Sequence, residues 1–190
     1  MVPGTYQIKL SAGGKTYTAS VELRKDPRTS TSQADFEKQF ELATRIRDSV
    51  GEGNQAVNQI RSVRGQIDAL KKRLRGDASS KPILDAADAL NKKMNAIEEK
   101  IIQPKSKSNE DPLNYPNQTV DQLMALQGTV ESADTAPTKQ SGDVYAELLS
   151  RLNVQLSAWR EIQTKDLAAL NDLIQKSNIP PIAPVAERKR

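Results

Sequence analysis

The chain has 190 residues, a formal net charge of +4, and neither cysteine nor histidine. This length suits one domain, or one domain with part of another. The missing thiols and imidazoles exclude disulfides, cysteine nucleophiles, zinc sites built on cysteine or histidine, and triads with a histidine base. We therefore expect no catalytic residue, cofactor or metal in this chain.

Leucine, isoleucine, valine and phenylalanine make up about 22% of the residues, just above the range of disordered chains. So thin a core fits long helices that each bury a narrow apolar stripe. No apolar run is long enough to span a membrane, and no apolar signal segment follows Met1. The sequence thus predicts neither a transmembrane segment nor a signal peptide within this chain.

Residues 1–28 are predicted to form a β-hairpin, because apolar and polar residues alternate on both sides of a glycine pair. The alternating apolar residues are Tyr6, Ile8, Leu10, Tyr17, Ala19, Val21 and Leu23. An isolated hairpin is marginal in water and leaves its strand edges unpaired. Since the first strand begins almost at Met1, we expect this hairpin to be the end of a truncated β-sandwich.

Residues 29–178 are predicted to form an elongated antiparallel bundle of three or four helices, so the fold class is mainly α. The first helix, about 32–75, opens on a capping box at Ser32 and carries apolar residues at coiled-coil spacing. Glycines inside this helix either mark a kink or let another helix approach closely. Gly53 lies on one of its seven-residue apolar rows.

Three further helices follow, at about 82–103, from Thr119, and at about 143–177. The second has the most regular apolar stripe, and a capping box is expected to open the third at Thr119. The helices are expected to alternate in direction, up, down, up and down. Loops are expected near residues 76–80, 103–118 and 134–142, and a disordered basic tail over 179–190.

Neighbouring carboxylates are the first candidates for chemistry. They occur as the pairs Asp85/Asp88, Glu98/Glu99 and Glu110/Asp111. Glycoside hydrolysis needs two carboxyls facing each other across a cleft, which near neighbours on one helix face do not provide. We therefore expect these pairs to lie on solvated faces.

A few residues are candidates for binding rather than for catalysis. A basic cluster of Lys71, Lys72, Arg73 and Arg75 lies at the end of the first helix and could contact an anionic surface. Cations at the end of a helix also suit the helix dipole. Nucleic acid is not an expected partner. Trp159 lies on an apolar stripe, where a core role is favoured over a binding anchor. The candidate interaction residues are Lys71, Lys72, Arg73, Arg75, Tyr115 and Trp159.

Several short motifs occur one after another along almost the whole chain, from residue 3 to residue 182. They are Pro3–Tyr6, Gly14–Tyr17, Asp26–Arg28, Asn114–Pro116, Ser132–Thr138, Asp166–Asn171 and Ile179–Pro181. Together they resemble the C-terminal region of bacterial secreted proteins with VPS10/sortilin-type, BNR-repeat β-propellers, which are often labelled glycosyl hydrolases or exo-sialidase-like.

This resemblance implies a hairpin that closes an immunoglobulin-like sandwich and a helical appendage with no catalytic carboxylate of its own. The parent protein would be secreted or periplasmic, and its β-sandwich and propeller would be the partners of this chain. Two alternatives remain open. The chain could be a free-standing coiled-coil adaptor that forms homo-oligomers, or an accessory part of a hydrolase whose active site lies elsewhere.

Overall fold

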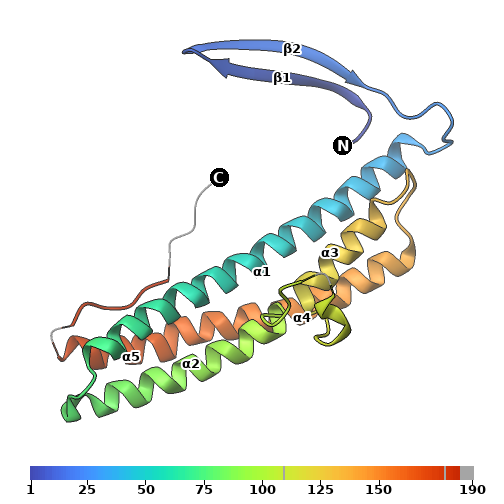
Figure 1. Cartoon of the computed structure of the whole chain (residues 1–190). Coiled ribbons are helices and arrows are strands. Elements are labelled where there is room, and N and C mark those ends of the chain that lie inside the picture. The colour runs from blue at the N-terminus through green and yellow to red at the C-terminus, as the bar shows by residue number, and fades with distance from the viewer. Residues whose placement is uncertain (109, 178, 185–190) are drawn as a thin grey trace.

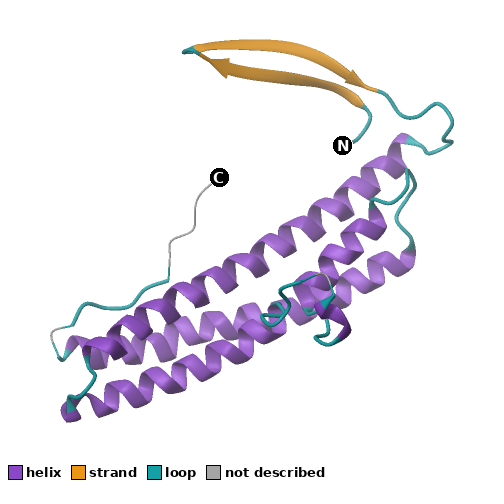
Figure 2. Ribbon diagram, viewed as in Figure 1, coloured by secondary structure: helices purple, strands orange, loops and turns teal. Residues whose placement is uncertain are grey.

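The computed structural model describes residues 1–108, 110–177 and 179–184 of the chain (Figure 1). A two-stranded ribbon at the N-terminus is followed by an elongated bundle of helices (Figure 2). The predicted class, mainly α with an N-terminal hairpin, is therefore confirmed.

The hairpin consists of β1 (Gly4–Ala12) and β2 (Lys15–Leu23), which pair antiparallel. Gly13 and Gly14 form the tight turn with φ angles of 54° and 74°, a region that glycine adopts without strain. In the observed register, apolar residues lie opposite apolar residues, as Ile8 does opposite Ala19. One face of the ribbon is therefore apolar and the other is polar.

The first long helix, α1, spans Gln33–Arg73 and begins at the predicted cap. The Ser32 hydroxyl accepts a hydrogen bond from the Asp35 backbone N–H at 3.2 Å. The short 3₁₀ turn η1 (Ala78–Ser80) then leads into α2 (Lys81–Ile101), where proline occupies the first turn. Both helices have the predicted extents to within a few residues.

The second half of the chain holds η2 (Asp111–Leu113), α3 (Thr119–Val130), α4 (Lys139–Glu161), η3 (Ile162–Asp166) and α5 (Leu167–Gln175). The predicted capping box of α3 was displaced by one residue. The Gln118 backbone N–H donates to the Asp121 carboxylate, while the Thr119 hydroxyl donates to the Lys100 carbonyl. The predicted start of the fourth helix, at about residue 143, was also wrong. The helix α4 begins at Lys139 and is capped by Thr138, which lies in the expected loop.

The bundle has three legs: α1, then α2 followed by α3, then α4 followed by α5. The predicted alternation of four helix directions was wrong. Two contacts show the direction of each helix relative to α1. Lys71 pairs with Asp88 and Arg61 with Glu98, so α2 is antiparallel to α1. The Gln39 amide donates to the Val130 carbonyl at 2.8 Å and Gly53 lies against Val120, so α3 is antiparallel to α1 as well. The two helices therefore lie in line along α1, in the same direction (Figure 1).

The third leg, α4 with α5, runs parallel to α1. Ser49 hydrogen-bonds to Tyr145, and Gln59 accepts from the Trp159 indole at 2.8 Å. The rule that short turns reverse direction does not apply between α2 and α3, because a long connection joins them. At about 1.5 Å per residue, α2 and α3 end to end cover about 50 Å of the roughly 62 Å length of α1.

The turn η3 is a π-helical turn inside the third leg. The Leu167 backbone N–H donates to the Ile162 carbonyl, five residues back, instead of four. Both side chains are buried, and five residues of regular α-helix would turn Leu167 away from the core. The wider turn therefore keeps the apolar stripe of α4 continuous with that of α5.

Close packing between α1 and α3 depends on Gly53, which is buried. A Cβ atom at this position would lie only 2.6 Å from the Val120 side chain. By contrast, nothing lies within 4 Å of a Cβ at Gly51 or Gly65. Of the two predicted roles for these glycines, close helix approach therefore applies to Gly53.

The C-terminal segment was expected to be disordered from residue 179, but residues 179–184 pack on the bundle. Ile182 is buried, and its backbone exchanges two hydrogen bonds with the Asn171 side chain, at 2.7 and 2.8 Å. The Gln66 amide donates to the Ala183 carbonyl at 2.7 Å. The remaining part of the predicted tail, 185–190, lies outside the described residues.

Candidate functional site

The apolar face of the hairpin is left uncovered by the fold. Ile8, Leu10 and Tyr17 are 57%, 60% and 57% exposed, and Val21 and Leu23 are also exposed. In the described part of the chain, neither strand packs against a helix. The link between the ribbon and the bundle includes a hydrogen bond from the Gln33 amide to the Pro3 carbonyl at 3.2 Å.

The basic cluster lies in and just after the last turn of α1. Lys71 forms an ion pair with Asp88 on α2, so it helps to join the two helices. The other three side chains of the cluster are exposed: Lys72, Arg73 and Arg75. Their position at the carboxyl end of a long helix suits its dipole, which is the structural role considered above.

The two aromatic candidates lie in different surroundings. Trp159 is buried on α4, and its indole N–H is satisfied by Gln59. Tyr115 lies in the connection before α3, where the Lys105 ammonium sits 5.9 Å from its ring centre. The length of α2, about 30 Å, separates this connection from the basic cluster. The candidate residues therefore do not form one site.

Glu98 corrects the expectation that all neighbouring carboxylates are solvated. Its side chain is only 5% exposed and accepts hydrogen bonds from Arg61 at 2.7 Å and Arg64 at 2.5 Å. A buried carboxylate is costly unless it is paired, and here two guanidiniums on α1 supply the pairing. Glu98 therefore ties α2 to α1, whereas its neighbour Glu99 is exposed.

The other carboxylate pairs also have structural partners. Asp85 pairs with Lys81 one turn away on α2. The Asp111 carboxylate accepts the backbone N–H groups of Lys107 and Ser108, and these bonds hold its pKa below the usual range. Such contacts shape turns and helix ends.

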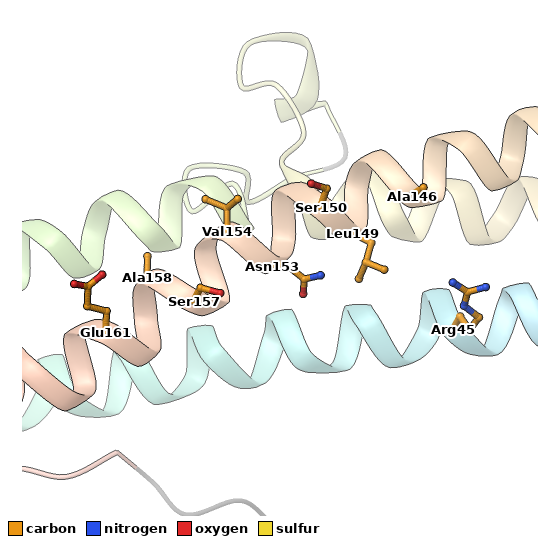
Figure 3. A pocket seen from close by; sticks show the side chains of 9 residues that line it. All are labelled: Arg45, Ala146, Leu149, Ser150, Asn153, Val154, Ser157, Ala158 and Glu161. Carbon is orange, nitrogen blue, oxygen red and sulfur yellow. The ribbon is translucent and has the colours of Figure 1, made fainter.

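A shallow groove of about 780 Å³ lies along the exposed side of α4, beside α1 (Figure 3). Arg45 borders one end and Glu161 the other. The Lys165 ammonium donates to the Glu161 carboxylate and lowers its pKa, so Glu161 is anionic at neutral pH. The middle of the groove is lined mostly by small side chains: Ala146, Ser150, Asn153, Ser157 and Ala158.

This groove was not predicted from the sequence. The available signal was a row of small residues on α4, Ala146, Ser150, Asn153 and Ser157, at spacings of four, three and four. That row lies beside the leucine stripe of the same helix and has the same periodicity. Its neighbour across the groove, Arg45, belongs to α1, and only the packing of the two helices brings it there.

Within residues 1–108, 110–177 and 179–184, no group of three acidic residues is placed to hold a metal ion. None of the helices described is both long and apolar enough to cross a lipid bilayer. Comparisons with known protein families, with curated proteins and with solved structures found no match to this chain.

Proposed function

We propose that the chain is a non-catalytic structural or interaction module, attached through its hairpin to a larger extracellular β-propeller protein of the glycosyl-hydrolase-like class. One observation carries the proposal, the continuous apolar face that the ribbon exposes to water. The motif resemblance supplies the kind of parent protein. Under this proposal the helical bundle acts by packing and spacing, without turnover.

The shape of the exposed face suits a second β-sheet as its cover. At about 3.3 Å per residue each strand is about 30 Å long, and side chains alternate strictly between the two faces. Sheets pack face to face through such apolar sides, and further strands would pair the open edges of the ribbon. Covering a half-exposed large apolar side chain contributes about 1 kcal/mol, so the whole face would contribute several.

Hydrogen exchange tests the attachment. In this chain alone, we expect the amides of Tyr6–Leu10 to exchange fast, because the two strands are held mainly by each other. In the full polypeptide, found by reading the coding region upstream of Met1, we expect at least about a hundredfold slower exchange. Slow exchange in the isolated monomer, or an upstream region without a β-propeller, would contradict the proposal.

A deletion in the full polypeptide separates a structural appendage from an accessory part of an active site. Removing residues 29–184 should lower the yield of folded protein, because it removes an attached folded bundle. The turnover number per folded molecule should stay within about twofold, because a structural appendage supplies no group that positions the transition state. Enzymes lose rate when such groups are lost. A large fall in the turnover number would favour the accessory role instead.

A further inference from the structure

The surface between α1 and α5 already holds a peptide, which is residues 179–184 of the same chain. After α5 the chain turns back and runs alongside α1 (Figure 1). No Cα atom of α1 lies within 8 Å of a Cα atom of α5, so this segment bridges two helices that do not pack directly on each other. Ile182 is its anchor, because this side chain is only 5% exposed, whereas Pro181 and Ala183 on either side are exposed.

Two side-chain amides hold the backbone of this segment. Asn171 on α5 accepts a hydrogen bond from the Ile182 N–H at 2.7 Å and donates to the Ile182 carbonyl at 2.8 Å. Gln66 on α1 binds Ala183 in the same way, accepting at 3.2 Å and donating at 2.7 Å. Neighbouring residues of an extended chain direct their N–H and C=O groups to opposite sides, as in a strand between two others. Asn171 and Gln66 thus take the place of two flanking strands, and we call them the amide clamp.

The prolines of the segment suit this way of binding. Pro180, Pro181 and Pro184 have no N–H, so Ile182 and Ala183 carry the only backbone donors of residues 180–184, and the amide clamp accepts both. Proline also favours extended backbone in the residue before it, which lowers the entropy that the peptide loses on binding. Main-chain hydrogen bonds combined with one apolar anchor are typical of sites that recognise extended peptides.

We propose that the amide clamp is a docking site for an extended, proline-flanked segment of a partner protein, which displaces residues 179–184 of this chain. The partner needs an aliphatic residue at the place of Ile182, followed by a residue with a free N–H. Release of the cis segment breaks no helix or strand, and the two neutral, half-buried amides become hydrated when it leaves. The clamp lies on the bundle, so this inference does not depend on the proposed role of the hairpin.

A partner protein is favoured over a second copy of this chain as the source of the displacing segment. In a second copy the same residues already occupy their own clamp, where they make identical contacts at high effective concentration. Exchange between copies therefore gains no contact. A partner segment with further contacts of its own can outcompete the cis segment.

Fluorescence anisotropy with a labelled peptide of residues 179–184 tests the proposal on the full chain. The unaltered chain should bind the peptide weakly, because its own segment competes, and Ile182→Asp should bind it at least about tenfold more tightly. The new carboxylate cannot occupy a buried apolar position, so it leaves the clamp empty. Asn171→Ala added to Ile182→Asp should weaken binding about tenfold through two lost hydrogen bonds, while the matched change Asn153→Ala on α4 should stay within about twofold.

Hydrogen exchange of the unaltered chain gives a measurement that needs no variant. The Ile182 amide should exchange at least about a hundredfold faster than that of Ile60 on α1, because the segment detaches without unfolding of the bundle. Equal protection would overturn the proposal, as would a folded Ile182→Asp chain that binds no peptide, or binding that Asn171→Ala leaves unchanged. Self-association that Ile182→Asp abolishes would overturn the partner assignment, by giving the clamp to a second copy.

Discussion

At the scale of single residues, Gly53 shows how a poor helix former can stabilise a helical protein. Glycine in a helix interior costs about 1 kcal/mol relative to alanine. Here the missing Cβ lets α3 approach α1, because Val120 occupies the space that any side chain would need. The contact between the helices therefore outweighs the local propensity.

Gly53→Ala should lower the free energy of unfolding by about 1–3 kcal/mol, because the new methyl group would overlap Val120 and force the helices apart. Gly51→Ala, two residues away in open space, should instead raise it by up to about 1 kcal/mol. Urea denaturation followed by circular dichroism measures both. Equal effects of the two variants would show that α3 does not pack as closely as described.

Glu98 is the second residue whose role depends on its position. Glu98→Gln should destabilise the chain by about 2 kcal/mol, because it weakens two charge-assisted hydrogen bonds and leaves the partly buried Arg64 without its counter-charge. Glu99→Gln makes the same change on the exposed neighbour and should stay within about 0.5 kcal/mol. If thermal unfolding curves of both variants overlap with wild type, Glu98 does not join α2 to α1.

At the scale of elements, the π turn reconciles an apolar stripe with an extra residue. The leucines of α4 recur at helical spacing, but Ile162 and Leu167 are five residues apart. A regular helix would point one of them towards solvent, at a cost of about 2 kcal/mol for a buried aliphatic side chain. Widening one turn by a residue costs less free energy than exposing such a side chain, and the chain forms this wider turn.

Deleting Thr164, an exposed residue of the π turn, should therefore be tolerated. The deletion sets Ile162 and Leu167 four residues apart, so a regular α-turn can bury both, and the melting temperature should change by only a few degrees. Deleting Ser157 from regular α4 should cost about 3 kcal/mol or more, because the buried residues after it rotate away from the core. Thermal melts distinguish the two outcomes, and equal losses would refute the explanation.

The hairpin is the element whose local pattern and surroundings disagree. Its alternation is that of a half-buried strand pair, and the tight glycine turn satisfies the local geometry. In a completed sheet such an apolar face would be covered, whereas here it faces water. This mismatch is the physical reason for proposing an attachment to another β-sheet.

At the scale of the whole molecule, stability resides in the bundle and not in the ribbon. Substituting Ile8→Lys and Tyr17→Lys should leave the unfolding free energy within about 0.5 kcal/mol, because both side chains are already more than half exposed. Ile60→Ala in the core should cost about 2–5 kcal/mol. Denaturant titrations of the three proteins check this, and a large loss from the hairpin variant would mean that its apolar face is covered.

The sequence by itself determined the elements whose signals are local. Ser32 caps α1 through its own hydroxyl, the glycine pair forms the hairpin turn, and the stripe of α2 follows helical spacing. These features depend on residues within about one or two turns of each other, which a linear pattern records. The mainly α class and the N-terminal hairpin followed from them.

Only the tertiary structure decided how distant parts meet. The direction of α3, the burial of Glu98 between two arginines, and the placing of Arg45 beside the α4 groove all depend on residues far apart in the chain. No local spacing encodes such contacts, because they arise when helices pack and exclude water from shared surfaces. The apolar side of the hairpin was visible in the alternation of its residues, but only the fold showed that the bundle leaves this side uncovered.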